Sequence, residues 1–502
     1  MTPGINWNTS RRRLILRFVI RTSKKVSKII CDYLKYNMRR SVIFSFIIIF
    51  LLTSGLGCKG LSKTQQDAIK PVELTYWRVF DDSDSMTEII NAYHQLHPQV
   101  TITYRKLLPD EFEKELINAL AEDRGPDMFS IQNTWVGKYQ SKIAPLPASV
   151  KSTFQSIEGT VSKQLVVTTK NIPSLTIKQI KDNFVGVVAG DVARRDATTS
   201  EEKIWGVPFA VDTLALFYNK DMLDKAGIGT PPKTWDEFLN DVIAMTKISA
   251  DNKIIQAGAG IGGSTNVSRA FDILSVLMMQ GGTTMALDDG TPEFHAIPQN
   301  YNQEIGPGEQ ALRFYTDFAN TTKKGYTWNK TMPNSLDAFT RGLAGFFFGY
   351  SYNIPLVEAR APKLNYSVVP IPQLNPDAPI NLANYWVETV SKKSAHQDES
   401  WDFIQFAASA KQIQSYLNKT KKPAALRELI AGQKDDPVIG PFAQSALTAK
   451  SWYKGRDANA AETSFLQMID GVTNETALND TEAYKKALQQ ASTRVGQTVI
   501  GP

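Results

Sequence analysis

Groups that could perform acid–base or metal chemistry are few in this sequence of 502 residues. Adjacent carboxylates occur at Asp81–Asp82, Glu201–Glu202 and Asp288–Asp289, each in a polar, loop-like stretch. Hydrolysis of a glycan needs two carboxylates held in one cleft with separated pKa values, and most of these acids are better explained as solvated side chains. Four histidines are scattered and two cysteines are present, so the chain lacks a group of soft metal ligands. We expect no catalytic group, no metal and no other cofactor.

A glycine motif follows the short apolar run at residues 254–257. Its glycines are Gly258, Gly260 and Gly263, in the G-x-G-x-x-G spacing of dinucleotide-binding loops. Such a site also requires an acid about 20 residues later, in the following strand. The nearest pair, Asp288 and Asp289, lies in the turn-like stretch LDDGTPE. The motif therefore favours a strand-to-helix loop that lines a cleft, with Ser264, Thr265 and Asn266 as hydrogen-bond donors.

Cys58 ends a segment whose composition differs from that of the remaining chain. Residues 1–58 carry eleven Lys and Arg and one acid, whereas residues 59–502 carry 45 bases and 49 acids. The net charge of +6 thus reflects the leader, and the body has no positive excess to bind a nucleic acid. A basic stretch, the apolar run 42–52 and then small residues are typical of a signal peptide. An uncleaved membrane anchor is the alternative.

Small residues before a lone cysteine resemble the cleavage site of bacterial lipoproteins, in which that cysteine becomes the lipidated N-terminus. The place three residues before it, usually aliphatic, is Gly55, and Leu56 follows. We expect Cys58 to carry the lipid and residues 59–71 to form a polar tether. The sequence from Met38 would make a complete leader, so translation is expected to begin there. The alternative is that residues 1–37 form a basic cytoplasmic tail beside anionic lipid.

The body of about 440 residues is too long for one ordinary core and favours two lobes. Strands are predicted at 72–77, 100–106 and 126–131, and amphipathic helices at 85–97 and 110–124. This alternation predicts an α/β fold with a largely parallel sheet. Ligands of such sheets bind beyond the carboxyl ends of the strands, which here are followed by the loops RVFDDSDS and QNTWVGKY.

Two helix starts carry the spacing of a capping box, in which the side chains of a helix N-cap and of the third residue after it bond each other's backbone. The first pair is Ser85 with Glu88, and the second is Thr234 with Glu237.

Longer segments are similar to blocks of a known protein family, the family 1 extracellular solute-binding proteins. The opening segments are LTYWRVFDD, IINAYHQLHPQVTITYR and FEKELINALAEDRGPDMFSIQNTWVGKY. The most specific block is IWGVPFAVDTLALFYNKDMLDKAGIGTPPKTWDEF at 204–238, and the later blocks are FTRGLAGFFFGYSYNI and NYWVETVSKKSAHQDESWDFIQFAAS. The resemblance extends from about Val72 to the C-terminus. It implies a two-lobed Venus-flytrap receptor, with helices flanking a mainly parallel sheet in each lobe, that delivers a solute, usually an oligosaccharide, to an ABC importer.

In this family the chain crosses between the lobes several times. We expect crossings near residues 212, 344 and 377, which makes both lobes discontinuous. The first lobe would comprise 72–212 and 344–377, and the second 213–343 and 378–502. Asp212 interrupts the apolar run VPFAVDTLALFYN, and a buried acid is costly unless paired. We expect it at the crossing, facing a ligand; a neighbouring Arg or backbone partner is the alternative.

The resemblance also places aromatic and polar side chains at the cleft. Flat rings with polar neighbours suit a sugar, which has an apolar face and many hydroxyls, although Trp and Tyr are also ordinary core residues. The expected ligand-binding residues are Trp77, Asp81, Asp82, Asn133, Trp135, Asp212, Ser264, Tyr350, Tyr352, Trp386 and Trp452. Trp235 and Trp401 are expected in cores, and Trp205 fits either place. The two tyrosines also resemble ligands of ferric-ion receptors, but no further anionic partner for iron can be identified.

These observations predict a lipid-anchored, monomeric receptor on the extracytoplasmic face of a bacterial membrane. It would close over a carbohydrate by hinge motion and dock to ABC permease subunits. Two alternatives stay open: a surface-tethered glycan hydrolase, and a binding lipoprotein that feeds a sensor. A hydrolase would convert the sugars that it binds, whereas a receptor would return them intact.

Overall fold

The computed structural model describes Tyr33, Met38 and residues 61–160, 163–196, 198–299, 301–474 and 480–499. The expected signal peptide and the lipidated Cys58 lie outside the described residues. The chain divides into two units, Met1–Ile69 and Lys70–Pro502. In the first unit, α2 (Lys63–Ala68) begins with a capping box between Ser62 and Gln65. None of the helices in the described part is both long and apolar enough to cross a membrane.

The second unit contains a five-stranded sheet in the order β2-β1-β3-β16-β4. Its strands are β1 (Val72–Val79), β2 (Val100–Leu107), β3 (Met128–Gln132), β4 (Ile143–Ala144) and β16 (Trp386–Ser391). The first three are parallel, and their positions confirm the predicted strands. β16 runs antiparallel to β3, with Trp386 opposite Gln132. The carboxyl ends of β1, β2 and β3 therefore meet at one edge of the sheet.

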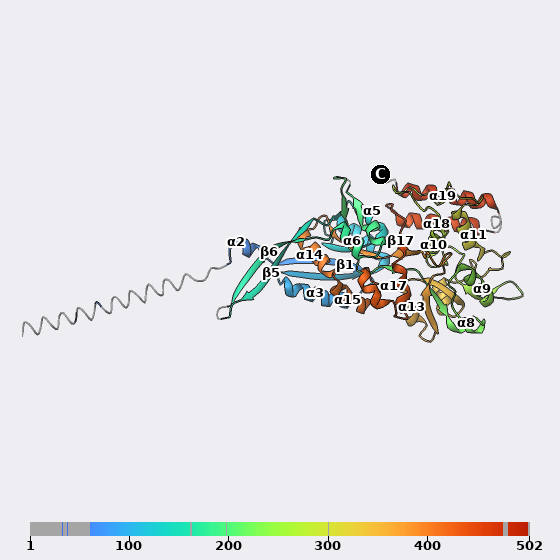
Figure 1. Cartoon of the computed structure of the whole chain (residues 1–502), viewed down its shortest axis with the longest axis horizontal. Coiled ribbons are helices and arrows are strands. Elements are labelled where there is room, and N and C mark those ends of the chain that lie inside the picture. Colours follow the sequence, from blue (N-terminus) through green and yellow to red (C-terminus); the bar gives the residue numbers. More distant parts are fainter. Residues whose placement is uncertain are drawn as a thin grey trace, which may run out of the picture. The chain divides into compact units, whose positions relative to one another are not determined.

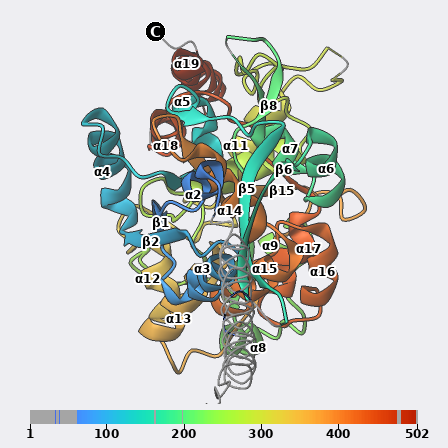
Figure 2. The same cartoon turned by 90° about the vertical axis from the view of Figure 1, so that its left-hand side faces the viewer.

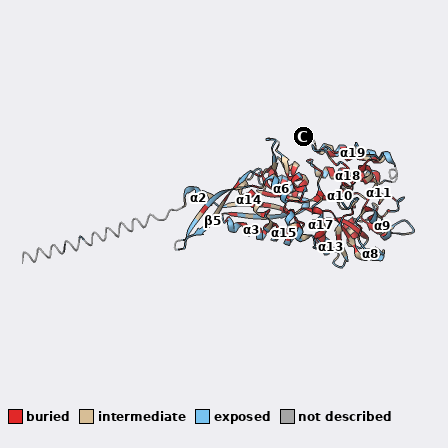
Figure 3. Cartoon of the chain, viewed as in Figure 1, coloured by how far each residue is buried: buried red, intermediate tan, exposed pale blue. Residues whose placement is uncertain are grey.

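Helices on both faces of this sheet bury its apolar side chains (Figures 1 and 3). They are α3 (Asp84–Leu96), α4 (Pro109–Ala121), α5 (Val136–Tyr139), α6 (Ile177–Asn183), α7 (Val187–Val192), α14 (Gln397–Ala407), α15 (Ala410–Thr420) and α16 (Arg427–Gln433). The capping box expected at Ser85 is wrong, because α3 begins one residue earlier and the Ser85 hydroxyl donates to the carbonyl of Asp82 (2.7 Å). The box at Thr234 is confirmed at the start of α9 (Trp235–Met245).

A second five-stranded sheet has the order β11-β12-β13-β10-β14. Its strands are β10 (Ala215–Asn219), β11 (Lys247–Ile248), β12 (Ile254–Ala259), β13 (Ala344–Gly349) and β14 (Tyr366–Pro370). β12 and β13 are parallel, while β10 is antiparallel to both of its neighbours. The sheet is thus mixed, which corrects the expected mainly parallel arrangement for this lobe.

Helices also enclose the second sheet, and α18 and α19 lie side by side in Figures 1 and 2. These helices are α8 (Lys220–Lys225), α9 (Trp235–Met245), α10 (Ala270–Gln280), α11 (Pro307–Asp317), α12 (Ser335–Thr340), α13 (Asn353–Arg360), α17 (Gly440–Ala446), α18 (Ala458–Val472) and α19 (Thr481–Val499). Trp235 and Trp401 are 1% and 0% exposed, which confirms their core positions, and Trp205 is buried in the first core.

The glycine motif at 258–263 serves close packing. A Cβ on Gly258 would lie 2.3 Å from the carbonyl oxygen of Val242 in α9, and one on Gly260 would lie 2.6 Å from the Ser335 side chain. Helices α9 and α12 therefore approach β12 and the residue after it too closely for any side chain at these positions. This contact explains the spacing without a bound nucleotide.

A small sheet joins the two large ones. Its strands, in the order β17-β15-β9, are β9 (Asp212–Thr213), β15 (Asn381–Asn384) and β17 (Ala449–Lys450). The first core contains residues from 74–211 and 383–449, and the second contains residues from 214–382 and 452–495. The chain thus passes between the cores three times, each time through one strand of this small sheet, which we call the crossing sheet.

The crossing sheet corrects the expected lobe boundaries. The chain leaves the first core at 212–213, near the expected crossing, but β13 and β14 belong to the second sheet, so segment 344–377 is not part of the first lobe. Segment 378–502 is not wholly in the second lobe, because β16 lies in the first sheet. Every residue of β13 is buried, and a strand buried on both faces gives no alternation to show which sheet receives it.

Two hairpins complete the second unit. The long one consists of β5 (Ser149–Glu158) and β6 (Gln164–Pro173), and the short one of β7 (Ala193–Arg195) and β8 (Glu202–Ile204). Val150 and Ser152 at the base of the long hairpin are buried, while Ile157 and Leu165 near its far end are exposed. Figure 3 shows this far end in pale blue.

Candidate functional site

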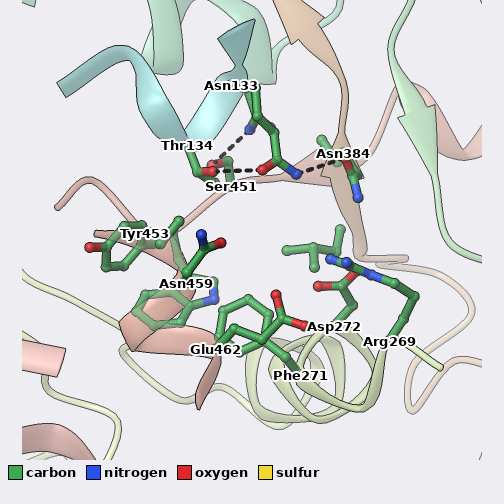
Figure 4. Close-up of a pocket in the computed structure, with 15 residues that line it drawn as sticks. Asn133, Thr134, Arg269, Phe271, Asp272, Asn384, Ser451, Tyr453, Asn459 and Glu462 are labelled. Atoms are coloured by element: carbon green, nitrogen blue, oxygen red, sulfur yellow. Dashed lines mark hydrogen bonds and ion pairs between the residues drawn. The ribbon is translucent and has the colours of Figure 1, made fainter. Parts of the chain in front are cut away.

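A cavity of about 360 Å³ lies where the first sheet, the second core and the crossing sheet meet. The ends of β1 and β3, the start of α4 and the strands β9, β15 and β16 contribute side chains to its wall from one side, and Arg269, Tyr352, Asn459 and Glu462 do so from the other. A smaller cavity of about 50 Å³ adjoins it and shares Gln132, Arg269, Asn384, Asn459 and Glu462 (Figure 4). The position, beyond the carboxyl ends of parallel strands, is the one at which open α/β sheets bind ligands.

Aromatic rings form one wall of the larger cavity. Trp135 lies 6.0 Å from Tyr139 in a stacked pair and 5.7 Å edge-on from Trp386. Phe80 packs edge-on against Trp386 at 6.0 Å and stacks on Tyr352 at 5.9 Å. Apolar ring faces and polar ring edges thus occur in the same wall, an arrangement that suits a ligand with both kinds of surface.

The floor on the side of the first sheet is a network of buried charges. Arg78 Nη2 pairs with Glu388 Oε1 at 2.9 Å, and Lys422 Nζ donates to Asp81 at 2.6 Å. Burial alone would raise the pKa of Asp81, but Lys422 and Arg78 outweigh it and lower that pKa. Arg78 Nη1 forms an ion pair with Asp81 Oδ2 at 3.5 Å but has no hydrogen-bond partner in the described part of the chain. Because Arg78 also lines the cavity, its guanidinium can donate to a ligand.

Asp212 lines the larger cavity from the crossing sheet, yet the protein already occupies its carboxylate. Oδ2 accepts from the Ser351 amide (2.9 Å) and hydroxyl (2.7 Å), and Oδ1 accepts from the Thr213 amide (2.9 Å). Burial raises the pKa of Asp212 to about 7, although these hydrogen bonds oppose the rise. The protein thus supplies backbone and hydroxyl partners for this acid, which links the crossing sheet to the loop after β13. Its contact with a ligand stays a prediction.

Amide and hydroxyl side chains are seven of the fifteen residues that line the smaller cavity. Figure 4 shows Asn133, Ser451 and Asn384 opposite Asn459 and Glu462. The Asn133 amide donates to Asp191 at 2.9 Å, while its Oδ1 has no partner among the described residues. Burial raises the pKa of Glu462 despite the nearby positive charge of Arg269. Both residues can bond hydroxyl groups of a ligand.

Seven of the expected ligand-binding residues line these cavities. They are Asp81, Trp135, Asp212, Tyr352 and Trp386 in the larger cavity, and Asn133 and Trp452 in the smaller one. Trp386 belongs to the first sheet, whereas the expected boundaries placed it in the second lobe. Trp452 is 8% exposed and packs in the second core, with its indole N–H donating to Ser275 (3.2 Å).

Four expected residues do not line either cavity. Trp77 lies under the Arg105 guanidinium (4.7 Å), and exposed Asp82 pairs with Lys106. Ser264 donates to Asp470 at 2.7 Å, so the glycine loop does not supply the expected donors.

Tyr350 is the fourth. Its ring is 0% exposed in the second core, and its hydroxyl donates to Asp272 at 2.6 Å. It therefore holds the loop after β13 in place and does not face the cavity. Tyr352, two residues later, is the tyrosine of this loop that lines the larger cavity.

Sequence reasoning missed several cavity residues. Arg78 and Phe80 follow one another closely in the stretch TYWRVF, and a cation inside an apolar strand could have marked this place. Lys422, Arg269 and Glu462 come from distant helices and loops, and no local pattern indicates that they converge. Among the described residues, no three His, Cys, Asp or Glu side chains are grouped so as to hold a metal.

Comparisons with known proteins agree with this architecture. The family model described as bacterial extracellular solute-binding protein matches residues 80–414. A galactooligosaccharide-binding protein of Bacillus subtilis (strain 168) is 21% identical over 466 residues, which cover 91% of this chain and 97% of that protein. The diacetylchitobiose-binding protein of Streptomyces coelicolor is 22% identical over 476 residues, which cover 90% and 100%.

Other matches are shorter or concern solved structures. A binding protein of Brucella abortus (strain 2308) is 25% identical over 211 residues, so the match covers 41% of this chain and about half (46%) of that relative. The crystal structure of a cyclic α-maltosyl-1,6-maltose binding protein of Arthrobacter globiformis has a TM-score of 0.63 at 16% identity and covers 86% of this chain and 99% of its own. A cyclo/maltodextrin-binding protein complexed with maltotetraose also scores 0.63, at 15% identity and with 86% and 98% covered. These likenesses confirm the two-lobed α/β fold.

Proposed function

Because the chain belongs to the family of bacterial extracellular solute-binding proteins, we propose that it captures a carbohydrate in the cavity between its two cores and delivers it to an ABC importer. An oligosaccharide is the proposed ligand. Relatives named as binding galactooligosaccharide and diacetylchitobiose support this class.

The observation that carries the proposal is the composition of the cavity wall. Rings of Trp135, Trp386 and Tyr352 lie beside the charged groups of Arg78 and Lys422 in one space of about 360 Å³, within the range of small-molecule sites. Ring faces can cover the apolar face of a sugar, while charged and amide groups bond its hydroxyls. Asp81, Asn133 and Asp212 are the acceptors proposed for this second role.

Closure of the cavity is proposed to occur at the crossing sheet. Only three short strands connect the two cores within the described residues. A few residues at such connections can absorb the backbone change of a hinge motion. A ligand that contacts both cores then favours the closed arrangement, since it interacts with both sides only when they are together.

We further propose that the receptor is monomeric, is not an enzyme, and is held at the outer face of the membrane by a lipid on Cys58. Two or more acyl chains hold a protein stably, whereas one chain does so only marginally. Two of the cavity carboxylates, Asp81 and Asp212, are engaged by protein groups. The state of the recovered sugar distinguishes the receptor from the hydrolase alternative.

A calorimetric and thermal-shift screen of the purified protein against mono- and oligosaccharides tests the proposal. A ligand present at 100 times its Kd should add about 2.7 kcal/mol of stability. Chromatography of the recovered sugar should find it intact, whereas shortened products would identify a hydrolase. Absence of binding across sugars of varied length and linkage would refute a carbohydrate ligand.

A further inference from the structure

Phe80, which lines the larger cavity, has an unusual backbone conformation. Its φ is 69°, in the left-handed region, and it is the only aromatic residue with positive φ among the described residues. A bulky side chain in that region is a genuine outlier, and such outliers persist only where the surroundings hold them. The ring is 39% exposed and belongs to neither core. Local folding therefore does not explain why this position is strained.

The Phe80 ring makes a contact between the two halves of the site. Phe80 directly follows β1 of the first sheet, whereas Tyr352 follows β13 of the second. Their rings lie 5.9 Å apart and 11° from parallel. Among the ring pairs that residues lining the larger cavity form within the described part of the chain, this one alone joins the first-sheet side to the second-sheet side.

Phe80 and Tyr352 each contact a second aromatic ring on their own side of the cavity. Phe80 packs edge-on against Trp386 at 6.0 Å. Tyr352 stacks on Tyr350 at 5.7 Å, and the hydroxyl of Tyr350 is fixed by Asp272. A continuous row of rings, Trp386, Phe80, Tyr352 and Tyr350, thus extends from the first sheet along the larger cavity into the second core.

We propose that Phe80 and Tyr352 form an aromatic clasp that joins the two halves of the cavity and sets how readily it opens. Opening the cleft at the crossing sheet must separate the two rings, because they belong to opposite sides. An aromatic pair of this geometry should favour the closed arrangement about two- to tenfold. Control of ligand entry and release by this pair rests on the proposed function, whereas the contact between Phe80 and Tyr352 forms without a ligand.

The test measures the separation of the two halves directly, without added sugar. Spin labels are attached to a genetically encoded keto amino acid at Lys178 and Lys253, exposed positions on opposite sides, so that the native cysteines stay in the full chain. Double electron–electron resonance then compares the wild type with Phe80→Asn, which removes the ring but tolerates a left-handed backbone. Phe80→Tyr keeps the ring and is the matched control.

Phe80→Asn and Tyr352→Ala should each shift the distance distribution toward longer separations, and the double variant should shift it no further than either alone. Phe80→Tyr should retain the wild-type distribution. An unchanged distribution in Phe80→Asn, or a shift in only one of the two single variants, would overturn the clasp. The sugar screen is a separate measurement, so a failed carbohydrate proposal and a failed clasp are distinguishable.

Discussion

At the scale of single residues, the larger cavity contains one carboxylate that neighbouring cations keep ionised and one whose pKa lies near neutrality. Asp81 is held ionised by Lys422 and Arg78. Asp212 has hydrogen bonds from Ser351 and Thr213, and among the described residues no cation forms an ion pair with its carboxylate, although the charge of Lys422 slightly opposes the rise in its pKa. Its protonation should therefore respond to pH near neutrality.

Asp212 should lower stability as pH rises. Burial raises its pKa from 3.8 to about 7, so between these values the folded chain binds a proton that the unfolded chain has lost. The free energy of unfolding is therefore highest below about pH 4. It falls as the pH rises toward 7, by as much as about 4 kcal/mol in total. Asp212→Asn should remove this dependence. Denaturant unfolding of both proteins from pH 4 to 8 measures it, and a stability difference that is the same at every pH would show that Asp212 is always ionised.

Trp386→Ala should weaken ligand binding by about ten- to a hundredfold, because a buried ring face contributes about 1–3 kcal/mol. Calorimetry with the sugar found in the screen measures the change. Leu374→Ala, at a residue that is 53% exposed and lines neither cavity, is the control and should bind as the wild type does. Trp135→Ala should lower affinity and stability together, since Trp135 is also part of the first core. Unchanged affinity in Trp386→Ala would remove this ring from the site.

Part of the larger cavity could be predicted from the sequence, because aromatic and polar residues stand in the loops that follow β1 and β3. Trp135 and Asp81 follow predicted strands at their carboxyl ends, and that rule is general for parallel sheets. Tyr350 and Tyr352 were not separable from sequence, because two residues apart in a loop can face either the core or the cavity. Lys422 could not be placed at all, since its contact with Asp81 joins residues 341 positions apart.

At the scale of helices and strands, close backbone contacts fix how the second core packs. α9 lies so near β12 that Gly258 has no room for a side chain. Trp235 at the start of the same helix stacks on Phe348 of β13 at 5.8 Å and donates to Gln280 at 2.8 Å. One helix thus packs against two adjacent strands.

Gly258→Ala should cost about 1–3 kcal/mol, because its methyl group must displace the backbone of α9. Gly471→Ala is the matched substitution. Gly471 lies within α18 with nothing within 4 Å of an added Cβ, and alanine there should leave stability unchanged or raise it by up to about 1 kcal/mol. Denaturant unfolding compares the two. Equal effects would mean that the contact between α9 and β12 can relax.

Trp235→Ala and Trp401→Ala should each cost about 3–5 kcal/mol of stability, since both rings are fully buried. Neither residue lines the larger or the smaller cavity of the site, so the ligand affinity of the folded fraction should stay at the wild-type value. Urea titration and calorimetry separate the two effects. A variant that keeps its stability would show that its ring is not a core element.

Strands and helices of the first lobe followed from sequence because their apolar periodicity is local. The order of strands did not, since β16 comes from residues more than 250 positions beyond β3 yet pairs with it. The expected boundaries placed Trp386 on the wrong side for this reason. Pairing between distant strands depends on the whole fold, and no window of sequence contains it.

At the scale of the whole molecule, attachment to the membrane concerns residues beyond the described ones. Cys58→Ser should abolish acyl labelling and release soluble or uncleaved protein, because the thiol is the proposed attachment point. Labelling with a radioactive fatty acid, followed by membrane fractionation, measures both. Persistent labelling would refute a lipid on Cys58.

Mass spectrometry of the native protein tests the Met38 start, since a peptide from residues 26–35 would show that translation begins upstream.

The threefold crossing between the cores also determines the order in which the chain can fold. β16 lies between β3 and β4, so the first sheet stays incomplete during synthesis until residue 391 has been made. Contacts of such long sequence separation form slowly. A nascent chain that cannot finish either core early remains extended for longer, which favours threading through a secretion channel before collapse. A fragment that stops before Trp386 should accordingly show no cooperative unfolding transition.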